Sequence, residues 1–343
     1  MNHATPSDAT RHPGYDTLHG EMRVGDCERL AHDLVPGSVD LIVTSPPFAL
    51  TRRKDYGNPD QDEYVDWLVS KLAPLVPALA PTGSMVVDLG GAYEPGRPTR
   101  SLAPYRAMIA LCDGLGLELS QEFFWYNPAR MPSPAQWVNI DRVRVKDAVD
   151  FVPWLSRGRP KADNRKVLKD YSESQARLMR SGSSPAAVRP SGHTVGDGFL
   201  EDRGGAIPSN LLVFPNTESS GPYQSRMRDL GVAPHPARFP EHLPRFFVRF
   251  LTDPGDVVLD PFAGSNTTGA VAQSEGRRWI GFEERADYAA CSALRFLSPE
   301  LPDGEVAGIH AAIASGGHVR LPEGLFDPRP CHEVAPDPQP NLL

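Results

Sequence analysis

The string DPFAGSNTTG occupies residues 260–269, directly after the apolar run Val257–Leu259 and at the start of a stretch with helical spacing, Thr267–Ser274. A strand, a glycine-containing turn and a helix in this order are typical of doubly wound α/β folds, where ligands bind at the carboxyl ends of strands. The amides at the start of a helix also favour an anionic group. The string is neither GxGxxG nor a phosphate loop with GK[ST], so a dinucleotide or a nucleoside triphosphate has little support.

A carboxylate follows the next predicted strand, Trp279–Phe282, which ends at Glu283. At this place a carboxylate can accept hydrogen bonds from both ribose hydroxyls of an adenosine-type ligand, and Phe262 can stack on the adenine. A glycine-rich turn can also be purely structural. The position of Glu283 relative to the loop favours a cofactor site instead.

A second loop, TSPPF at residues 44–48, ends another apolar run, 38–44, and in a doubly wound sheet it lies on the same edge as DPFAGSNTTG. Its prolines lack amide hydrogens and leave carbonyl oxygens free as acceptors. The Ser45 hydroxyl and the Pro46 carbonyl can accept both hydrogens of a nucleobase amino group, while Phe48 stacks on the base. A paired base must leave the duplex to reach such a pocket. For SPPF alone, a proline-stiffened turn is the simpler reading.

Strand and helix patterns alternate at both ends of the chain and are separated by a long irregular stretch rich in glycine, proline and serine. This alternation predicts a doubly wound, mostly parallel α/β sheet interrupted by an insertion. Residues 1–20 and the proline-rich 298–343 are expected to be tails, because they show little apolar periodicity. The predicted strands are 38–44, 84–89, 121–126, 257–259 and 279–282, and the predicted helices are 62–72, 244–251, 267–274 and 285–296.

The 343 residues carry a net charge of −8, which argues against a polyanionic partner. From Pro128 to Pro190, however, 13 basic residues stand against 6 acidic ones. A basic segment favours phosphate contacts, although a solvated surface explains it as well. The four cysteines lack CxxC spacing and fit a reducing cytoplasm, and no apolar run is long enough to span a bilayer. We therefore expect a cytoplasmic protein without a metal, a disulfide framework or a membrane segment.

Taken together, the two loops resemble those of the S-adenosylmethionine-dependent DNA amino-methyltransferases, in the permuted order with the catalytic loop before the cofactor loop. Serine at position 45 resembles the N4-cytosine type, because the N6-adenine type usually shows DPPY. Further strings resemble the PvuII-type modification methylases of bacterial restriction-modification systems over roughly residues 20–297. They are VGD (24–26), WYNPARMPSP (125–134), KDAVD (146–150), KADNRKVL (161–168), RPSGH (189–193), GGAIPSNLL (204–212) and HPARFPEHLP (235–244).

This resemblance implies a circularly permuted, Rossmann-like methyltransferase fold that methylates a flipped cytosine in double-stranded DNA, with a restriction endonuclease encoded separately. The implied boundaries are an N-terminal tail (1–20), a catalytic half (21–130), a target-recognition region (131–230), a cofactor-binding half (231–297) and an acidic proline-rich tail (298–343). It gives no recognised sequence and no oligomeric state.

The resemblance also implies three groups of site residues. The catalytic group consists of Ser45, Pro46, Pro47 and Phe48. S-adenosylmethionine is expected to contact Asp26, His235, Asp260, Phe262, Gly264, Ser265, Asn266, Thr267 and Glu283. DNA is expected to contact Arg52, Arg53, Lys54, Arg142, Lys146, Lys161, Arg165 and Lys166. For Arg52, Arg53 and Lys54, which directly follow the catalytic loop, an exposed charge run is nearly as good a reading.

Other activities fit the sequence less well. Methylation at cytosine C5 needs a thiolate, usually in a Pro-Cys context, and the one such pair, Pro330-Cys331, lies far from either loop. N6-adenine methylation is the close alternative, since it differs by one residue of the loop. Relatives that modify RNA or a protein amide usually carry NPPY. A catalytically silent DNA-binding subunit is disfavoured by intact Ser45, Phe48 and Glu283.

Overall fold

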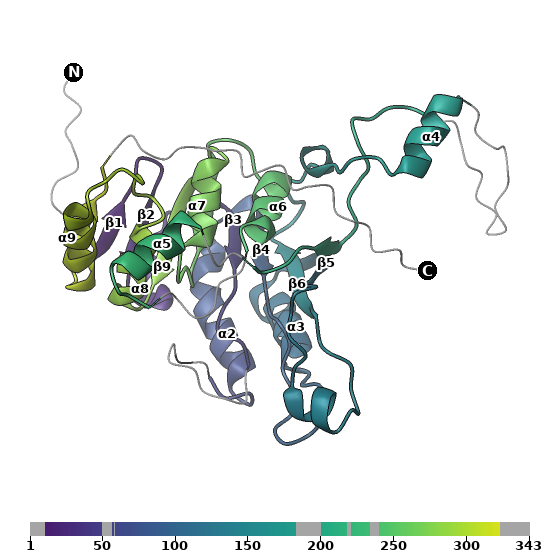
Figure 1. The fold of residues 1–343 in the computed structure, drawn as a ribbon, viewed down its shortest axis with the longest axis horizontal. Coiled ribbons are helices and arrows are strands. Elements are labelled where there is room, and N and C mark those ends of the chain that lie inside the picture. Colours follow the sequence, from purple (N-terminus) through teal and green to yellow (C-terminus); the bar gives the residue numbers. More distant parts are fainter. Residues whose placement is uncertain are drawn as a thin grey trace. The chain divides into compact units, whose positions relative to one another are not determined.

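The computed structural model describes residues 11–49, 57, 59–182, 200–217, 221–233 and 240–322. Within these residues, the strands form one ten-stranded sheet (Figure 1). Neighbouring strands from β2 to β4 run parallel, β1 is antiparallel to β2, and β6 is antiparallel to both β4 and β5. In spatial order the strands are β10 (His318–Arg320), β1 (Gly14–Asp16), β2 (Gly20–Val24), β9 (Arg278–Glu283), β8 (Val257–Asp260), β3 (Val39–Thr44), β4 (Leu79–Val87), β6 (Val149–Ser156), β5 (Glu118–Tyr126) and β7 (Leu211–Val213).

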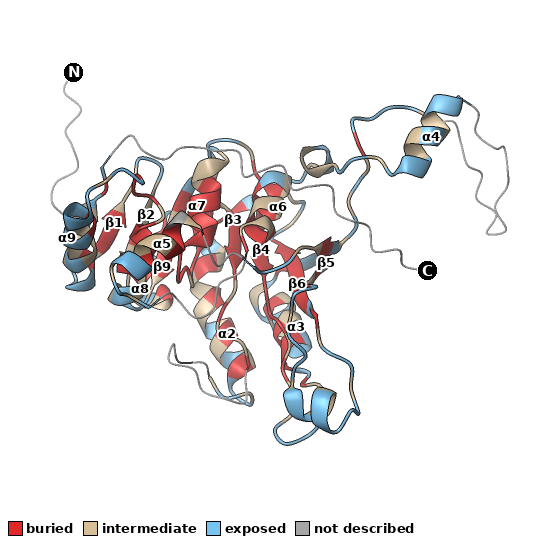
Figure 2. Cartoon of the chain, in the orientation of Figure 1, coloured by how far each residue is buried: buried red, intermediate tan, exposed pale blue. Residues whose placement is uncertain are grey.

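Helices cover both faces of the sheet, which explains the apolar runs of its central strands. In β3, Ile42 packs in the core on one face and Leu41 and Val43 pack in the core on the other. Figure 2 shows these strands as buried. The Ile42 side holds α1 (Cys27–Leu30), α2 (Tyr64–Leu72) and α3 (Ala103–Leu115), and the opposite side holds α5 (Pro222–Asp229), α6 (His242–Leu251), α7 (Thr267–Ser274), α8 (Ala286–Ala293) and α9 (Asp303–Ala314). The predicted doubly wound, mostly parallel sheet is confirmed.

The turn from β8 into α7 is fixed by an asparagine in the left-handed conformation. Asn266 has φ 53°, and its side chain accepts a hydrogen bond from the amide of Gly269, three residues into the helix. Its amide nitrogen donates to the Tyr15 hydroxyl at 3.0 Å. A Cβ atom at position 269 would lie 2.3 Å from the Asn266 Oδ1 atom, so glycine is required there. The predicted helix Thr267–Ser274 is confirmed at both bounds.

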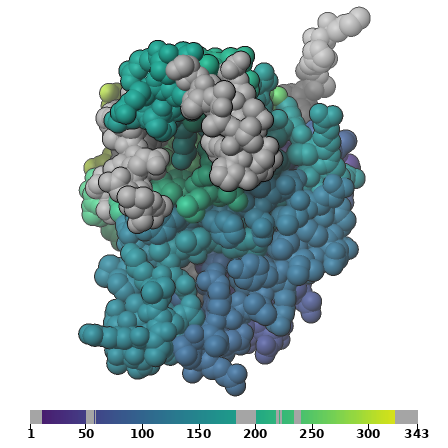
Figure 3. Space-filling view, turned by 90° about the vertical axis from the view of Figure 1, so that its right-hand side faces the viewer, coloured from purple at the N-terminus to yellow at the C-terminus, as the bar shows by residue number. Residues whose placement is uncertain are grey.

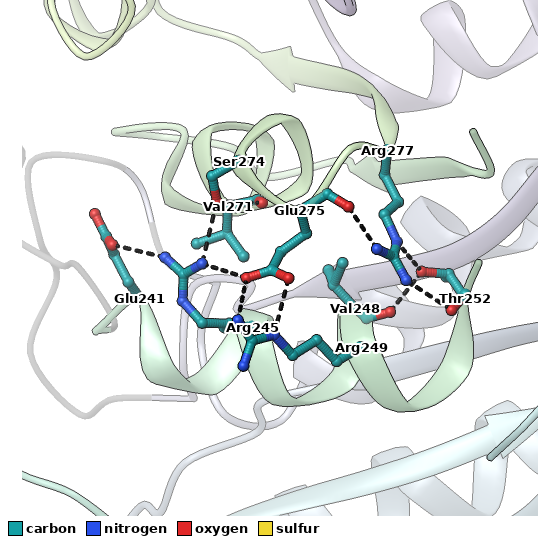
Figure 4. A network of polar contacts seen from close by, with 9 residues as sticks. All are labelled: Glu241, Arg245, Val248, Arg249, Thr252, Val271, Ser274, Glu275 and Arg277. Atoms are coloured by element: carbon teal, nitrogen blue, oxygen red, sulfur yellow. Dashed lines mark hydrogen bonds and ion pairs between the residues drawn. The ribbon is translucent and has the colours of Figure 1, made fainter. Parts of the chain in front are cut away.

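A network of charged side chains joins α6 to the end of α7 (Figure 4). Glu275 accepts hydrogen bonds from Arg245 and Arg249, and Arg277 binds the backbone oxygen and the hydroxyl of Thr252. Burial alone would raise the pKa of Glu275, but the two arginines hold it below its usual range. The network fixes the helix that carries the DPFAGSNTTG turn.

Both predicted tails take part in the sheet, which corrects the expectation for 11–20 and 298–322. Strand β10 pairs in parallel with β1 at the edge of the sheet. Val306 and Ile313 of α9 and the following Leu321 are buried in the core. Burial of these apolar side chains offsets the conformational entropy that the segment loses on folding. The prolines of the segment gave no indication of this contribution. Residues 323–343 lie outside the described part of the chain.

The predicted insertion 131–230 is also too broad. Strands β6 and β7 and helix α5 fall within it, yet β6 lies between β4 and β5 in the main sheet. The sequence pattern predicted no strand at VDFVPWLS, the run that forms β6; its proline is unusual inside a sheet. By its contacts, the segment Ala162–Ser209 belongs to a second unit. Its described part contains α4 (Glu173–Ser181) and an antiparallel bridge between Lys169 and Ala206.

In the part of the chain that the structure describes, no helix is both long and apolar enough to cross a membrane.

Candidate active site

The two loops singled out in the sequence meet in one cavity of about 490 Å³ at the carboxyl ends of β3, β8 and β9. Pairing of β3 with β8 places the ends of these strands side by side, as the doubly wound topology requires. TSPPF contributes Ser45, Pro46, Pro47 and Phe48 to the lining, and the second loop contributes Pro261, Phe262, Ala263, Gly264, Ser265 and Thr267.

At one end of the cavity, here called the base end, Ser45 donates a hydrogen bond from its hydroxyl to the Asp88 carboxylate at 3.2 Å. The backbone amide of Asp88 donates to the carbonyl of Thr44, because β3 and β4 are adjacent and parallel. Phe48 lies against Gly90, which has φ +57°; a Cβ atom there would come within 2.4 Å of the phenyl ring. The ring is thus held over the cavity by a position that only glycine can occupy.

Three charged residues at the base end were missed in the sequence. Asp88, Asp150 and Arg130 all line the cavity. Arg130 binds both carboxylate oxygens of Asp150, one of them at 2.8 Å. Burial, and then repulsion by Asp150, raises the pKa of Asp88 to about 8. Asp88 follows the buried run of β4 just as Ser45 follows that of β3, and this parallel is the signal by which it could have been found.

At the opposite end, here called the cofactor end, Glu283 is held by backbone amides. Its two oxygens accept hydrogen bonds from the amides of Gly264 and Arg285, each at 2.9 Å. Burial raises the pKa of Glu283 to about 7. Both Glu283 and Gly264 line the cavity, and their contact with S-adenosylmethionine remains a prediction.

Asp26 lies beside the cofactor end at the start of α1 and lines the cavity. It accepts hydrogen bonds from the amide of Glu28 at 2.8 Å and from the Lys71 ammonium group at 2.6 Å. Burial acts to raise its pKa, but these two donors hold the pKa of Asp26 below its usual range. The side chain is therefore a fixed anion at this wall.

Two of the predicted cofactor residues do not line the cavity. Asp260 is buried and accepts hydrogen bonds from the hydroxyls of Thr44 and Thr268, both at 2.7 Å. Burial raises its pKa to about 6. Asn266 is the fully buried helix cap described above. Both hold the two loops in shape, and their contact with S-adenosylmethionine remains a prediction. His235 lies outside the described residues.

Aromatic side chains that the sequence did not single out complete the walls. Trp67 of α2 lies with its ring centre 5.7 Å from that of Phe262, and both face the cavity. Trp125 from the end of β5 and Tyr288 of α8 line it as well. Their positions depend on helices and strands distant in the chain, so spacing around the loops could not reveal them.

The predicted DNA-contacting residues differ in their surroundings. Arg142 is exposed, and Lys146 is exposed with its ammonium group bonded to the carbonyls of Pro128 and Arg130. Lys161, in contrast, forms ion pairs with Asp253 at 2.9 Å and Asp256 at 2.6 Å. The charge of Lys161 is thus balanced within the protein, and its contact with DNA remains a prediction.

The other predicted DNA contacts remain predictions. Arg165 pairs with Asp163 at the surface of the second unit, which also contains Lys166. Arg52, Arg53 and Lys54 lie outside the described residues. Over the described ranges, no cluster of three or more His, Cys, Asp or Glu side chains is arranged to hold a metal ion.

Comparison with known proteins gives concordant matches. Residues 39–294 match the DNA methylase family. The chain is 45% identical to the type II methyltransferase M.PvuII of Proteus hauseri over 312 residues, which is 90% of this chain and 93% of that one. It is 27% identical to the DNA adenine methyltransferase YhdJ of Escherichia coli (strain K12), covering 73% of this chain and 74% of that one. The solved structure of PvuII DNA methyltransferase (cytosine-N4-specific) matches with a TM-score of 0.75 and 41% identity, covering 91% of this chain and 98% of that one.

Proposed function

Because this chain belongs to the DNA methylase family, we propose that it transfers a methyl group from S-adenosylmethionine to the N4 amino group of a cytosine flipped out of duplex DNA. One observation carries the proposal: the Ser45 hydroxyl, bonded to a buried carboxylate, lines the same cavity as Glu283 and Gly264. Acceptors for an amino group and a site for an adenosine-type ligand therefore share one space.

The cofactor end fits S-adenosylmethionine. The Glu283 carboxylate is held by two backbone amides and keeps further lone pairs for ribose hydroxyls on the cavity side. Phe262 and Tyr288 offer aromatic faces for the adenine, and Asp26 offers a fixed negative charge for its amino edge or the cationic groups. When bound, S-adenosylmethionine supplies an electrophilic methyl carbon.

The base end orients and activates the amino group. Ser45 donates its own hydrogen to Asp88, so its oxygen lone pairs are directed to accept one N4 hydrogen. The carbonyl of Pro46 accepts the other, and Phe48 stacks on the ring. As the nitrogen–carbon bond forms, the nitrogen must lose a proton. Ser45 takes up that proton and passes its own to the ionised Asp88 carboxylate, whose raised pKa makes it a stronger proton acceptor than an ordinary carboxylate.

Double-stranded DNA is the proposed substrate. The exposed Arg142 and Lys146 lie on the segment that follows the cavity-lining Arg130, where phosphates of DNA can reach them. The relation to a type II methyltransferase also supports a restriction endonuclease, encoded separately, that cuts the same sequence when it is unmethylated.

The test is mass spectrometry of nucleosides from unmethylated duplex DNA after incubation with isotopically labelled S-adenosylmethionine. Labelled N4-methylcytosine is expected. Labelled N6-methyladenine would keep the cofactor but overturn the inference from Ser45, and no label in any base would favour a catalytically silent DNA-binding protein. In the same assay Ser45→Ala should reduce turnover strongly, and calorimetry should find its affinity for the cofactor nearly unchanged; a large loss of cofactor affinity would show that Ser45 is misplaced.

A further inference from the structure

The segment between β5 and β6, residues 128–147 and here called the rim loop, starts and ends at the base end of the cavity. Because β6 is antiparallel to both β4 and β5, strand β5 runs in the same direction as β4 and its carboxyl end lies on the Asp88 edge. Trp125, just before the loop, and Asp150, just after it, line the cavity. The ion pair between Arg130 and Asp150 ties the two ends of the loop together.

The rim loop presents an unusual number of apolar side chains to solvent. Thirteen large apolar side chains are exposed among the described residues, and four of them lie in this short loop. Their exposed fractions are between 62% and 84%. Figure 2 shows the loop as the exposed turn below α3, and in Figure 3 this part of the chain, in teal, forms the lower left of the surface. The four are Met131, Ile140, Val143 and Val145.

This exposure does not result from a lack of internal contacts. The Trp137 ring packs edge-on against the Tyr93 ring with centres 5.5 Å apart, and the Arg144 guanidinium lies 4.7 Å from the centre of the Tyr93 ring. Arg144 also donates to the carbonyl of Pro98 at 2.8 Å and pairs with Asp147 at 3.2 Å. The loop is therefore fixed in shape while its apolar side chains point outward, a combination typical of a binding surface.

We propose that the rim loop is a wedge that enters the DNA duplex beside the flipped cytosine, with Met131 as the side chain that fills the space the base has left. The inference rests on the proposed function. Extruding a base breaks stacking at a cost of about a few kcal/mol, and an apolar side chain inserted between the neighbouring bases offsets part of it. Met131 directly follows Arg130 of the cavity wall, so a base held in the cavity leaves its gap next to this residue.

Charge supports DNA as the occupant. Of the four basic residues of the rim loop, Arg130 and Arg144 form ion pairs with Asp150 and Asp147, whereas Arg142 and Lys146 are exposed. Arg142 is exposed, and it can contact a phosphate while the apolar residues face the bases.

The experiment compares two duplexes that carry the recognition sequence, mapped beforehand by sequencing methylated plasmid DNA. In one the target cytosine is paired with guanine; in the other it faces an abasic site, so little stacking and no pairing must be broken. For Met131→Ala, kcat/KM should fall about 10-fold or more on the paired duplex and stay nearly unchanged on the unpaired one. Met131→Leu, which keeps the apolar bulk, should behave like the unsubstituted protein.

Val35→Ala is the matched control, because Val35 is similarly exposed but precedes the amino end of β3, whereas the cavity lies at the carboxyl end of that strand. An equal loss on both duplexes, or no loss on either, would overturn the wedge. A change of oligomeric state on sedimentation, with an unchanged ratio between the duplexes, would assign the loop to a contact between copies of the chain and would also overturn it. Failure of the proposed function is distinct, since the unsubstituted protein would then methylate neither duplex at cytosine.

Discussion

The two ends of the cavity hold their buried carboxyl groups in different ways. At the cofactor end, each oxygen of Glu283 accepts a hydrogen bond from a backbone amide. At the base end, the Asp88 carboxylate accepts hydrogen bonds from the Ser45 hydroxyl and from the backbone amide of Gly90, and it is repelled by the nearby Asp150. Backbone amides carry the same partial charge at every pH, whereas a neighbouring carboxylate makes the proton affinity of its partner depend on the whole cluster.

This difference separates binding from chemistry. A ligand is best held in one orientation by a group that does not rearrange. The amides of Gly264 and Arg285 are fixed dipoles that hold the Glu283 carboxylate in place for this purpose. A reaction that releases a proton needs a proton acceptor linked to the reacting atom. Burial raises the pKa of both carboxyl groups, to about 8 for Asp88 and to about 7 for Glu283, but of the two only Asp88 accepts a hydrogen bond from Ser45. The surroundings of the two carboxyl groups thus assign their roles.

The largest expected effect comes from removing the charge at the base end. Asp88→Asn keeps the size of the side chain and an acceptor for Ser45, but it cannot take up a proton. We expect kcat to fall about 100-fold or more, with the Kd for S-adenosylmethionine essentially unchanged. Single-turnover kinetics and calorimetry measure the two quantities.

Asp66→Asn is the matched control for this variant, because Asp66 is an exposed aspartate on α2. It should leave both quantities unchanged. A parallel loss of cofactor affinity in Asp88→Asn would mean that the two ends are not separate. An unchanged kcat would remove Asp88 from the path of the proton.

The cofactor end was predicted well from the sequence because its parts are contiguous. β8, the DPFAGSNTTG turn and α7 follow one another, so chain order alone gives the strand, the capped helix and the nearby Glu283. The same string could not show that Asp260 and Asn266 face inward. Their hydrogen bonds to Thr44 and Tyr15 reach residues more than 200 positions away.

The base end was predicted only in part, because it is assembled from separate strands. Ser45 was found by its proline-rich loop, but Asp88 can be recognised as a site residue only when β4 is known to pair with β3. Asp150 and Arg130 come together because β6 returns antiparallel between β4 and β5, a strand that was not predicted. Tertiary pairing, not local pattern, creates this charge cluster.

A somewhat smaller effect is expected at the cofactor end. Glu283→Gln replaces one carboxylate oxygen by an NH2 group, which cannot accept a hydrogen bond from a backbone amide. The side chain can then no longer bind both the amides of Gly264 and Arg285 and the hydroxyls of a ribose. We expect the Kd for S-adenosylmethionine to rise about 10- to 100-fold, with kcat at saturating cofactor much less affected. Glu305→Gln, at an exposed position of α9, is the control. An unchanged Kd would contradict the ribose assignment.

A pH series separates the two ends without mutation. Asp88 must be ionised to accept a proton, and its pKa is raised to about 8, so kcat should rise about 10-fold per pH unit below that value and level off above it. Glu283 has a pKa of about 7, so cofactor affinity should improve as pH rises and should level off at a lower pH than kcat. In Asp88→Asn the kcat profile should become flat. Coincident midpoints for kcat and Kd in the unsubstituted protein would contradict independent titration of the two ends.

The smallest expected effects extend the comparison beyond the cavity, to Lys161 and Arg142, which the sequence treats alike. Lys161 is paired with Asp253 and Asp256, whereas Arg142 is exposed on the rim loop. Arg142→Ala should lower the slope of log K against log salt for DNA binding by about 1, since one phosphate contact is lost. Lys161→Met should leave this slope unchanged and reduce the free energy of unfolding by less than about 1 kcal/mol, because the ion pairs are partly exposed. A changed slope for Lys161→Met would mean that DNA competes with the two aspartates for this lysine, so that its pairing in the free protein is not its pairing in the complex.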